Sequence, residues 1–154
     1  MDRNSLLFCR SRNNFINGQF LIMIKKKLLL AEDDEDDTML FLDFLKDRED
    51  LVLVYSCENG IEVIEYLDTI EDEREFPHLV LLDQNMPKMN GSQTLKVLKD
   101  NPRYASIPVA VYTTHSDKRL LADCYQSGAA AVLSKPISPT GYYEMMDELN
   151  RLIQ

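Results

Sequence analysis

Short apolar runs alternate along the chain with longer segments in which apolar residues recur at helical spacing. The apolar runs lie at residues 27–31, 51–56, 79–83, 108–112 and 129–134. Runs this short and this sharply bounded are typical of buried parallel strands. Between and after them, helices are predicted at residues 36–47, 59–70, 92–100, 116–128 and 138–153.

This alternation predicts an α/β fold in which helices cover both faces of a parallel sheet. We expect a flavodoxin-like, doubly wound five-stranded parallel sheet in the order 2-1-3-4-5, with five helices and right-handed crossovers. Ser92 and Ser116 are the predicted N-caps of their helices, and Gly128 is a predicted helix end. The acidic segment 71–78 is expected to be a solvated loop.

One domain accounts for a chain of 154 residues with 45% hydrophobic residues. We expect this domain to span residues 25–154. Residues 1–22 show neither helical nor strand periodicity, so residues 1–24 are predicted to be an N-terminal extension. That extension would be either disordered or upstream of the true start, for which Met23 is the candidate.

Charge and cysteine content narrow the classes of function. Lys and Arg number 17 against 26 Asp and Glu, a net charge of -9, which argues against nucleic acid as a partner. Cys9, Cys57 and Cys124 are far apart and form no CxxC pair, so neither a disulfide framework nor a zinc site is expected. A reducing cytoplasm is the natural location, and no apolar run approaches the ~20 residues of a membrane span.

Acidic residues gather where the first predicted strand ends. In an open α/β sheet, ligands bind beyond the carboxyl ends of the strands. The polar residues expected at these ends are Glu32, Asp33, Asp83, Thr113 and Lys135. In the order 2-1-3-4-5, the first and third strands are neighbours, so three carboxylates should converge in one pocket. Hard oxygen ligands of this kind suit Mg²⁺ or Mn²⁺.

The same pocket is suited to phosphoryl chemistry. Asp83 is expected to lie exposed before a tight loop, where its carboxylate can attack phosphorus and form an aspartyl phosphate. Lys135 and Thr113 would neutralise and hydrogen-bond the phosphoryl oxygens. The acids at 34–37 are expected in the first turn of the following helix, where the macrodipole favours each negative charge by ~0.3–1 kcal/mol.

Four motifs, taken together, resemble the receiver domain of two-component response regulators, in its stand-alone form. They are LLLAEDD, LVLLDQNMPKMNG, IPVAVYTT and GAAAVLSKP, and the resemblance extends over residues 26–153. It implies that Asp83 is the phosphoacceptor and that Asp33 is a direct Mg²⁺ ligand. Glu32, where the family often has Asp, would act largely through a bound water, and Asn85 would offer its backbone carbonyl to the metal.

The resemblance also assigns roles on the far side of the pocket. Thr113 would bind the phosphoryl group after activation, and Lys135 would pair with it. The bond between Lys135 and Pro136 is expected to be cis. Val132 stands where many receivers carry an aromatic switch residue, and its small β-branched side chain cannot act as a swinging ring.

The implied function is a phosphorylation-activated signalling switch. A sensor histidine kinase or phosphotransfer protein would supply the phosphoryl group, and a downstream protein would bind the face of helix 4, strand 5 and helix 5. Such a chain is not an enzyme, since it catalyses only its own phosphotransfer and dephosphorylation. Neither nucleic acid nor a membrane is an expected partner, and homodimer formation is left open.

Three other interpretations compete with this one. A phosphorylation-independent interaction module with the same fold is the main alternative, favoured by Val132 and opposed by the intact acidic pocket. A phosphatase acting on small substrates ranks last, because compact loops leave no cap domain. An EF-hand beginning at Asp33 fails, because Thr38 and Phe44 occupy the positions that require Gly and Glu.

Overall fold

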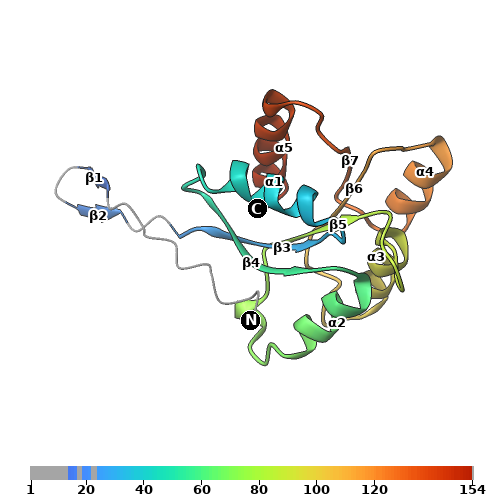
Figure 1. Cartoon of the computed structure of the whole chain (residues 1–154). Coiled ribbons are helices and arrows are strands. Elements are labelled where there is room, and N and C mark those ends of the chain that lie inside the picture. The colour runs from blue at the N-terminus through green and yellow to red at the C-terminus, as the bar shows by residue number, and fades with distance from the viewer. Residues whose placement is uncertain (1–13, 17–18, 22–23, 154) are drawn as a thin grey trace.

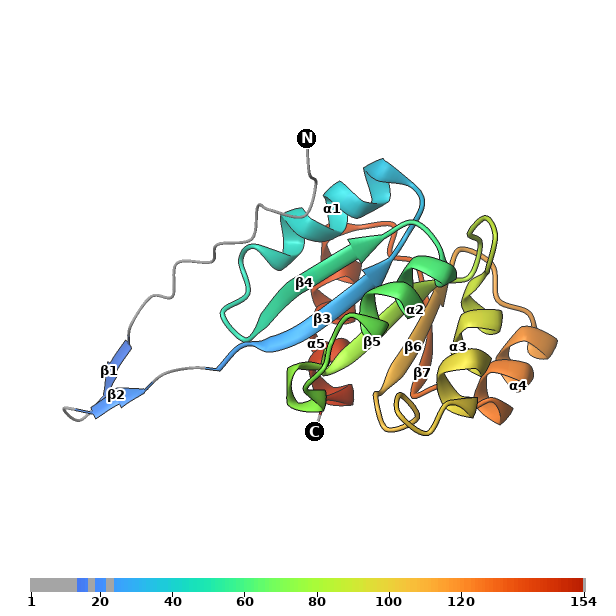
Figure 2. The same cartoon turned by 90° about the horizontal axis from the view of Figure 1, so that it is seen from below.

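The computed structural model describes residues 14–16, 19–21 and 24–153. Its main sheet has five parallel strands in the order β4-β3-β5-β6-β7, which lie side by side in Figure 2. Their bounds are β3 (Lys26–Ala31), β4 (Leu51–Cys57), β5 (Leu79–Asp83), β6 (Val109–Thr113) and β7 (Ala131–Ser134). When the five strands of this sheet alone are numbered 1 to 5 in chain order, their spatial order is 2-1-3-4-5, so the predicted fold is confirmed.

The described part of the chain has five α-helices, and Figure 1 shows that they cover the two faces of this sheet. They are α1 (Glu35–Leu45), α2 (Gly60–Asp68), α3 (Gly91–Asp100), α4 (Lys118–Gln126) and α5 (Pro139–Leu152). Helices α1 and α5 pack on one face, and α2, α3 and α4 pack on the other. No described helix has both the length and the apolar content needed to cross a membrane.

Side-chain alternation explains why the strands read as continuous apolar runs. Successive residues of a strand point to opposite faces of the sheet. In β3, Leu28 and Leu30 enter the core beneath α1 and α5, whereas Leu29 and Ala31 enter the core beneath the other helices. Because both faces are covered, every position of the strand interior is apolar.

The N-caps of two helices differ from the prediction. Helix α3 is capped by Asn90 in place of Ser92, because Asn90 and Gln93 form a reciprocal capping box. Helix α4 is capped by Asp117 in place of Ser116, since the Asp117 carboxylate accepts the Leu120 N–H at 2.7 Å. A carboxylate or amide one or two residues away thus competes successfully with a serine hydroxyl.

Other local expectations hold at the helix ends. The acids at 35–37 occupy the first turn of α1, as predicted, whereas Asp34 precedes that turn as the N-cap. Gly128, with a φ of +95°, follows the end of α4 in the left-handed conformation that favours glycine. The segment 71–78 contains a short 3-10 helix, η1 (Glu73–Glu75), capped by Asp72, which the charge pattern alone did not predict.

A small antiparallel pair precedes the main sheet. Strands β1 (Asn14–Ile16) and β2 (Gln19–Leu21) form their own two-stranded sheet. Three-residue strands are too short to show periodicity, although the sequence Asn17-Gly18 between them is a hairpin signal. Apart from β1, β2 and Ile24, the predicted extension at 1–24 lies outside the described residues, and the domain boundary stays a prediction.

Candidate functional site

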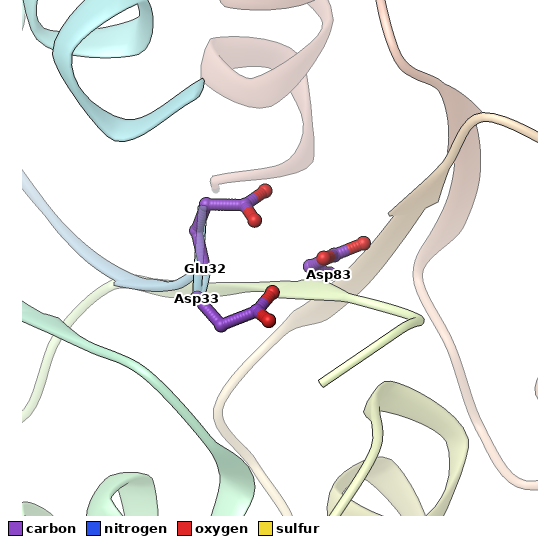
Figure 3. A group of neighbouring side chains, drawn as sticks. All are labelled: Glu32, Asp33 and Asp83. Atoms are coloured by element: carbon purple, nitrogen blue, oxygen red, sulfur yellow. The ribbon is translucent and has the colours of Figure 1, made fainter. Parts of the chain in front are cut away.

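Three carboxylates converge at the carboxyl ends of β3 and β5. Glu32 and Asp33 follow the last residue of β3, and Asp83 is the last residue of its neighbour β5. One carboxylate oxygen from each lies within 4.8 Å of the others. Figure 3 shows the Glu32 and Asp33 side chains extending from the end of β3 toward Asp83. The predicted convergence is therefore present, and its hard oxygen donors fit a divalent cation.

Asp83 is buried, contrary to the expectation that it lies exposed. Only 3% of its surface is accessible, because Glu32, Lys135 and the adjoining loop surround it. Burial raises the pKa of Asp83 to about 7, and the Glu32 charge adds to this effect, while Lys135 partly offsets it. Further positive charge beside Asp83 would favour its ionised form.

Lys135 supplies the one ammonium group that reaches these acids among the described residues. Its Nζ lies 2.8 Å from Glu32 Oε2, 2.9 Å from Asp37 Oδ2 and 3.4 Å from Asp83 Oδ1. Partial burial alone would lower the pKa of Lys135, but the hydrogen bonds to Glu32 and Asp37 raise it. Asp37, which was predicted only as an acidic residue in the first turn of a helix, therefore also forms an ion pair with Lys135.

Tyr112 is a site residue that the sequence analysis missed. Its hydroxyl donates a hydrogen bond to Glu32 Oε2, and its ring centroid lies 4.9 Å from Lys135 Nζ. Burial, followed by the Glu32 charge, raises the pKa of this phenol well above its usual range. The available signal was its position directly before Thr113, since a buried tyrosine hydroxyl at a strand end needs a polar partner.

Thr113 and Asn85 lie beside Asp83 in different ways. Thr113 is 1% exposed, and its hydroxyl donates to the His115 carbonyl at 3.1 Å and accepts the His115 N–H at 3.3 Å. Its backbone carbonyl accepts the Lys135 N–H at 2.9 Å, which joins β6 to the lysine. Asn85 donates its backbone N–H to Asp83 Oδ1 at 3.3 Å. Both predicted residues are thus at the pocket, with the threonine hydroxyl engaged by its own loop.

The loop after Asp83 is held close to the end of β5. Gly91 N–H donates to the Gln84 carbonyl at 3.1 Å, and the Gln84 side chain accepts the Ser92 N–H at 2.9 Å. A Cβ on Gly91 would lie 2.6 Å from the Asp83 carbonyl oxygen. Only glycine therefore lets α3 start this near to the end of β5.

Gly91→Ala is expected to destabilise the protein by about 1–3 kcal/mol. The start of α3 and the backbone at Asp83 would have to move apart to make room for the added methyl group. Thermal denaturation of the two proteins measures the effect. Gly141→Ala is the matched control, since its Cβ would lie 3.2 Å from the Pro136 Cβ and 3.4 Å from the Ser138 hydroxyl. Equal unfolding temperatures for Gly91→Ala and the unchanged chain would contradict the close approach.

Two further expectations concern β7 and the segment after it. Val132 is half-buried, and its N–H donates to the Tyr125 hydroxyl of α4 at 3.3 Å, so an aromatic residue does reach this strand, from a helix. The expected cis bond before Pro136 is wrong, because the described residues contain no cis peptide bond. The trans form is ordinarily preferred even before proline, by ~0.5–1 kcal/mol.

Cysteine and histidine add no ligands to this pocket in the part of the chain that is described. Cys57 and Cys124 are buried and free, while Cys9 lies outside the described residues. His78 accepts the Lys27 N–H through Nδ1 at 2.8 Å, which gives this loop residue a structural partner. His115 is exposed beside Thr114, with its Nδ1 3.1 Å from the threonine hydroxyl.

Comparison with known proteins places this pocket in a family. The response regulator receiver domain matches residues 28–147. Chemotaxis protein CheY1 of Helicobacter pylori is 29% identical over 94 residues, which cover 61% of this chain and 73% of that protein. Response regulator Rre1 of Synechocystis is 32% identical over 111 residues, which cover 72% of this chain and 42% of that protein.

A solved structure of a metal-bound response regulator is also similar to this chain. The Mn(2+)-bound form of response regulator Rcp1 is 30% identical to this chain, with a TM-score of 0.68 over 80% of this chain and 90% of that one. Together with the acidic cluster, this likeness is consistent with a divalent-metal site of the receiver type. From its fold, its acidic pocket and the matched residues, the chain belongs to the response regulator receiver domain family.

Proposed function

We propose that the chain is a phosphorylation-activated signalling switch, in which Asp83 accepts a phosphoryl group from the phosphohistidine of a sensor histidine kinase or phosphotransfer protein. One observation carries the proposal. Asp83 ends β5 with a lysine ammonium 3.4 Å from one of its oxygens and two further carboxylates beside it. This arrangement provides a nucleophile, a counter-charge for phosphoryl oxygens and ligands for Mg²⁺ or Mn²⁺.

The transfer requires ionised Asp83. One of its oxygens attacks phosphorus, the bond from phosphorus to the histidine nitrogen breaks, and the electron pair stays on that nitrogen. A bound Mg²⁺ would supply positive charge that favours ionised Asp83 and neutralises the phosphoryl oxygens. Burial and the Glu32 charge raise the Asp83 pKa to about 7, so that positive charge would increase the ionised fraction of Asp83 at neutral pH.

Each of the other pocket residues would hold either the metal ion or the phosphoryl group. Asp33 and Asp83 would be direct ligands, joined by the backbone carbonyl of Asn85. Glu32 would act through a water, since its two oxygens already accept three hydrogen bonds. Thr113 would exchange its bond to the His115 carbonyl for one to a phosphoryl oxygen.

A downstream protein would bind the phosphorylated state at the face formed by α4, β7 and α5. This face exposes large apolar side chains, with Tyr125 51%, Ile137 101% and Tyr143 45% accessible. Exposed aromatic and aliphatic residues are common anchors of protein interfaces. Two hydrogen bonds would transmit a movement of Thr113 to this face. The Lys135 N–H donates to the Thr113 carbonyl, and the Val132 N–H donates to the Tyr125 hydroxyl.

Intact mass after incubation with acetyl phosphate tests the proposal. We expect one phosphoryl adduct that requires Mg²⁺ and is absent from Asp83→Asn, because the amide cannot replace the carboxylate as nucleophile. An adduct that persists in Asp83→Asn would contradict the role of Asp83.

A phosphorylation-independent interaction module is the second candidate, and Val132 is the observation that favours it. If the chain neither gains a phosphoryl group nor binds Mg²⁺, as measured by calorimetry, this second function takes the lead. Binding of Mg²⁺ together with an Asp83-dependent adduct would exclude it.

A further inference from the structure

We propose that Tyr112 is a positioning residue for phosphorylation, whose hydroxyl holds Glu32 in place so that Lys135 can leave it for the phosphoryl group. The inference rests on the proposed function and adds to it a residue to which the resemblance assigns no role. The geometry that carries it is the hydrogen bond from Tyr112 to the same Glu32 oxygen that Lys135 contacts.

Bulk water does not reach the Glu32 side chain, so its hydrogen bonds come from the protein, apart from any water held by the metal ion. The residue is 2% exposed, and its side chain is inaccessible. Its Oε1 accepts the Asp34 N–H at 3.0 Å, while Oε2 accepts both the Tyr112 hydroxyl and the Lys135 ammonium. A buried carboxylate oxygen that loses its donors is costly, because no water replaces them.

Lys135 is shared among several acids before phosphorylation. Its Nζ is 2.8 Å from Glu32 but 3.4 Å from Asp83, so the contact to the phosphoacceptor is the longer one. Pairing with a phosphoryl group on Asp83 requires the ammonium to shift away from Glu32. With Tyr112 present, Glu32 Oε2 keeps one donor throughout this shift, and the cost of moving the lysine falls.

The lengths of the two side chains make this pair specific. Glu32 extends one methylene further than the aspartate often found at this position in receivers, and it reaches the Tyr112 hydroxyl across the pocket. Aspartate at position 32 would fall short of the hydroxyl while keeping a carboxylate beside the metal site. The hydroxyl of Tyr112 should therefore matter only when residue 32 is glutamate.

A double-mutant cycle of Y112F and E32D tests this dependence. We expect Y112F to slow phosphorylation by acetyl phosphate about tenfold at saturating Mg²⁺, as for loss of one hydrogen bond to a charged group. In the E32D background, the same Tyr112→Phe change should alter the rate by less than about twofold. E32D removes the hydrogen bond from the other side, and so serves as the second variant if Y112F folds poorly.

Thermal denaturation without metal gives a readout independent of phosphorylation. We expect Y112F to lower the unfolding temperature by roughly 3–6 °C in the unchanged background and hardly at all in the E32D background. Y104F is the matched control, because the Tyr104 hydroxyl donates to the Asp68 carboxylate far from the pocket. It should lower the unfolding temperature but leave the phosphorylation rate unchanged.

The outcomes separate this inference from the proposed function. Failure of the unchanged chain to take up a phosphoryl group would overturn both. Normal phosphorylation of the unchanged chain with an equal rate in Y112F would overturn the inference alone. Equal slowing by Tyr112→Phe in both backgrounds would also overturn it, because the tyrosine would then act through packing and not through Glu32.

Discussion

Asp83→Asn should unfold at a higher temperature than the unchanged protein at pH 8 when no divalent cation is present. The Asp83 pKa is about 7 in the folded protein, against an ordinary value of 3.8. Between these two values the folded state binds more protons than the unfolded state, so stability falls as the pH rises from about 4 to about 7. Above pH 7 the full cost of the buried charge is present, and asparagine removes it.

The expected gain is on the order of 2–4 kcal/mol at pH 8, from a pKa difference of about three units. It should shrink at pH 5 and vanish near pH 4, as thermal denaturation across this range would show. Mg²⁺ should raise the unfolding temperature of the unchanged chain more than that of Asp83→Asn, because the variant lacks the Asp83 carboxylate as a charged ligand. Asp123→Asn, an exposed change on α4, is the control. A destabilised Asp83→Asn at pH 8 would contradict the account of a charge-crowded pocket.

Lys135→Met should have the opposite effect, and a comparable one. Methionine keeps an unbranched side chain that extends as far as the lysine Cε but removes the cation that lies within 3.4 Å of Glu32, Asp37 and Asp83. Loss of one partner from a buried ionic cluster is expected to cost on the order of 3 kcal/mol, because the acids left behind are uncompensated. For a chain of this size, the unfolding temperature should fall by roughly 6–12 °C.

The pH dependence identifies the source of this loss. The raised pKa of Lys135 means that its stabilising contribution is complete below the unfolded pKa near 10.5 and is lost only at more alkaline pH. From pH 5 to 8 the charge of Lys135 in the unchanged protein is therefore constant. If Lys135→Met is more stable at pH 5 than at pH 8, the gain in stability reports protonation of the acids. Lys96→Met is the control, since its ion pair with Asp100 is on the surface and should contribute at most about 1 kcal/mol. A cost as small as that of the control would contradict the role of Lys135 as the pocket's counter-charge.

The acidic pocket was predictable because it depends on backbone topology. Apolar runs locate the strands, and the residue types that follow them place Glu32, Asp33 and Asp83 at one edge of the sheet. The strand order then makes the first and third strands neighbours, which the pairing of Ala31 with Leu82 confirms. No side-chain conformation is needed for these conclusions.

The missed features depend on side-chain direction and reach. Tyr112 contacts Glu32 only because its position in β6 points the ring toward α1 and α5, and Asp37 meets Lys135 only because α1 starts at Glu35. The burial of Asp83 likewise results from neighbours distant in sequence. A strand-end position alone does not distinguish an exposed carboxylate from one enclosed by other side chains.

Chemical identification of the phosphorylated residue tests the central claim most directly. Borohydride reduces an aspartyl phosphate to homoserine, so the protein would be phosphorylated with acetyl phosphate and Mg²⁺, reduced, digested and analysed by peptide mass spectrometry. We expect homoserine at position 83, and none in a sample from which Mg²⁺ has been chelated. Homoserine at position 33 or at any other aspartate, with residue 83 unmodified, would contradict the assignment of Asp83 as the phosphoacceptor.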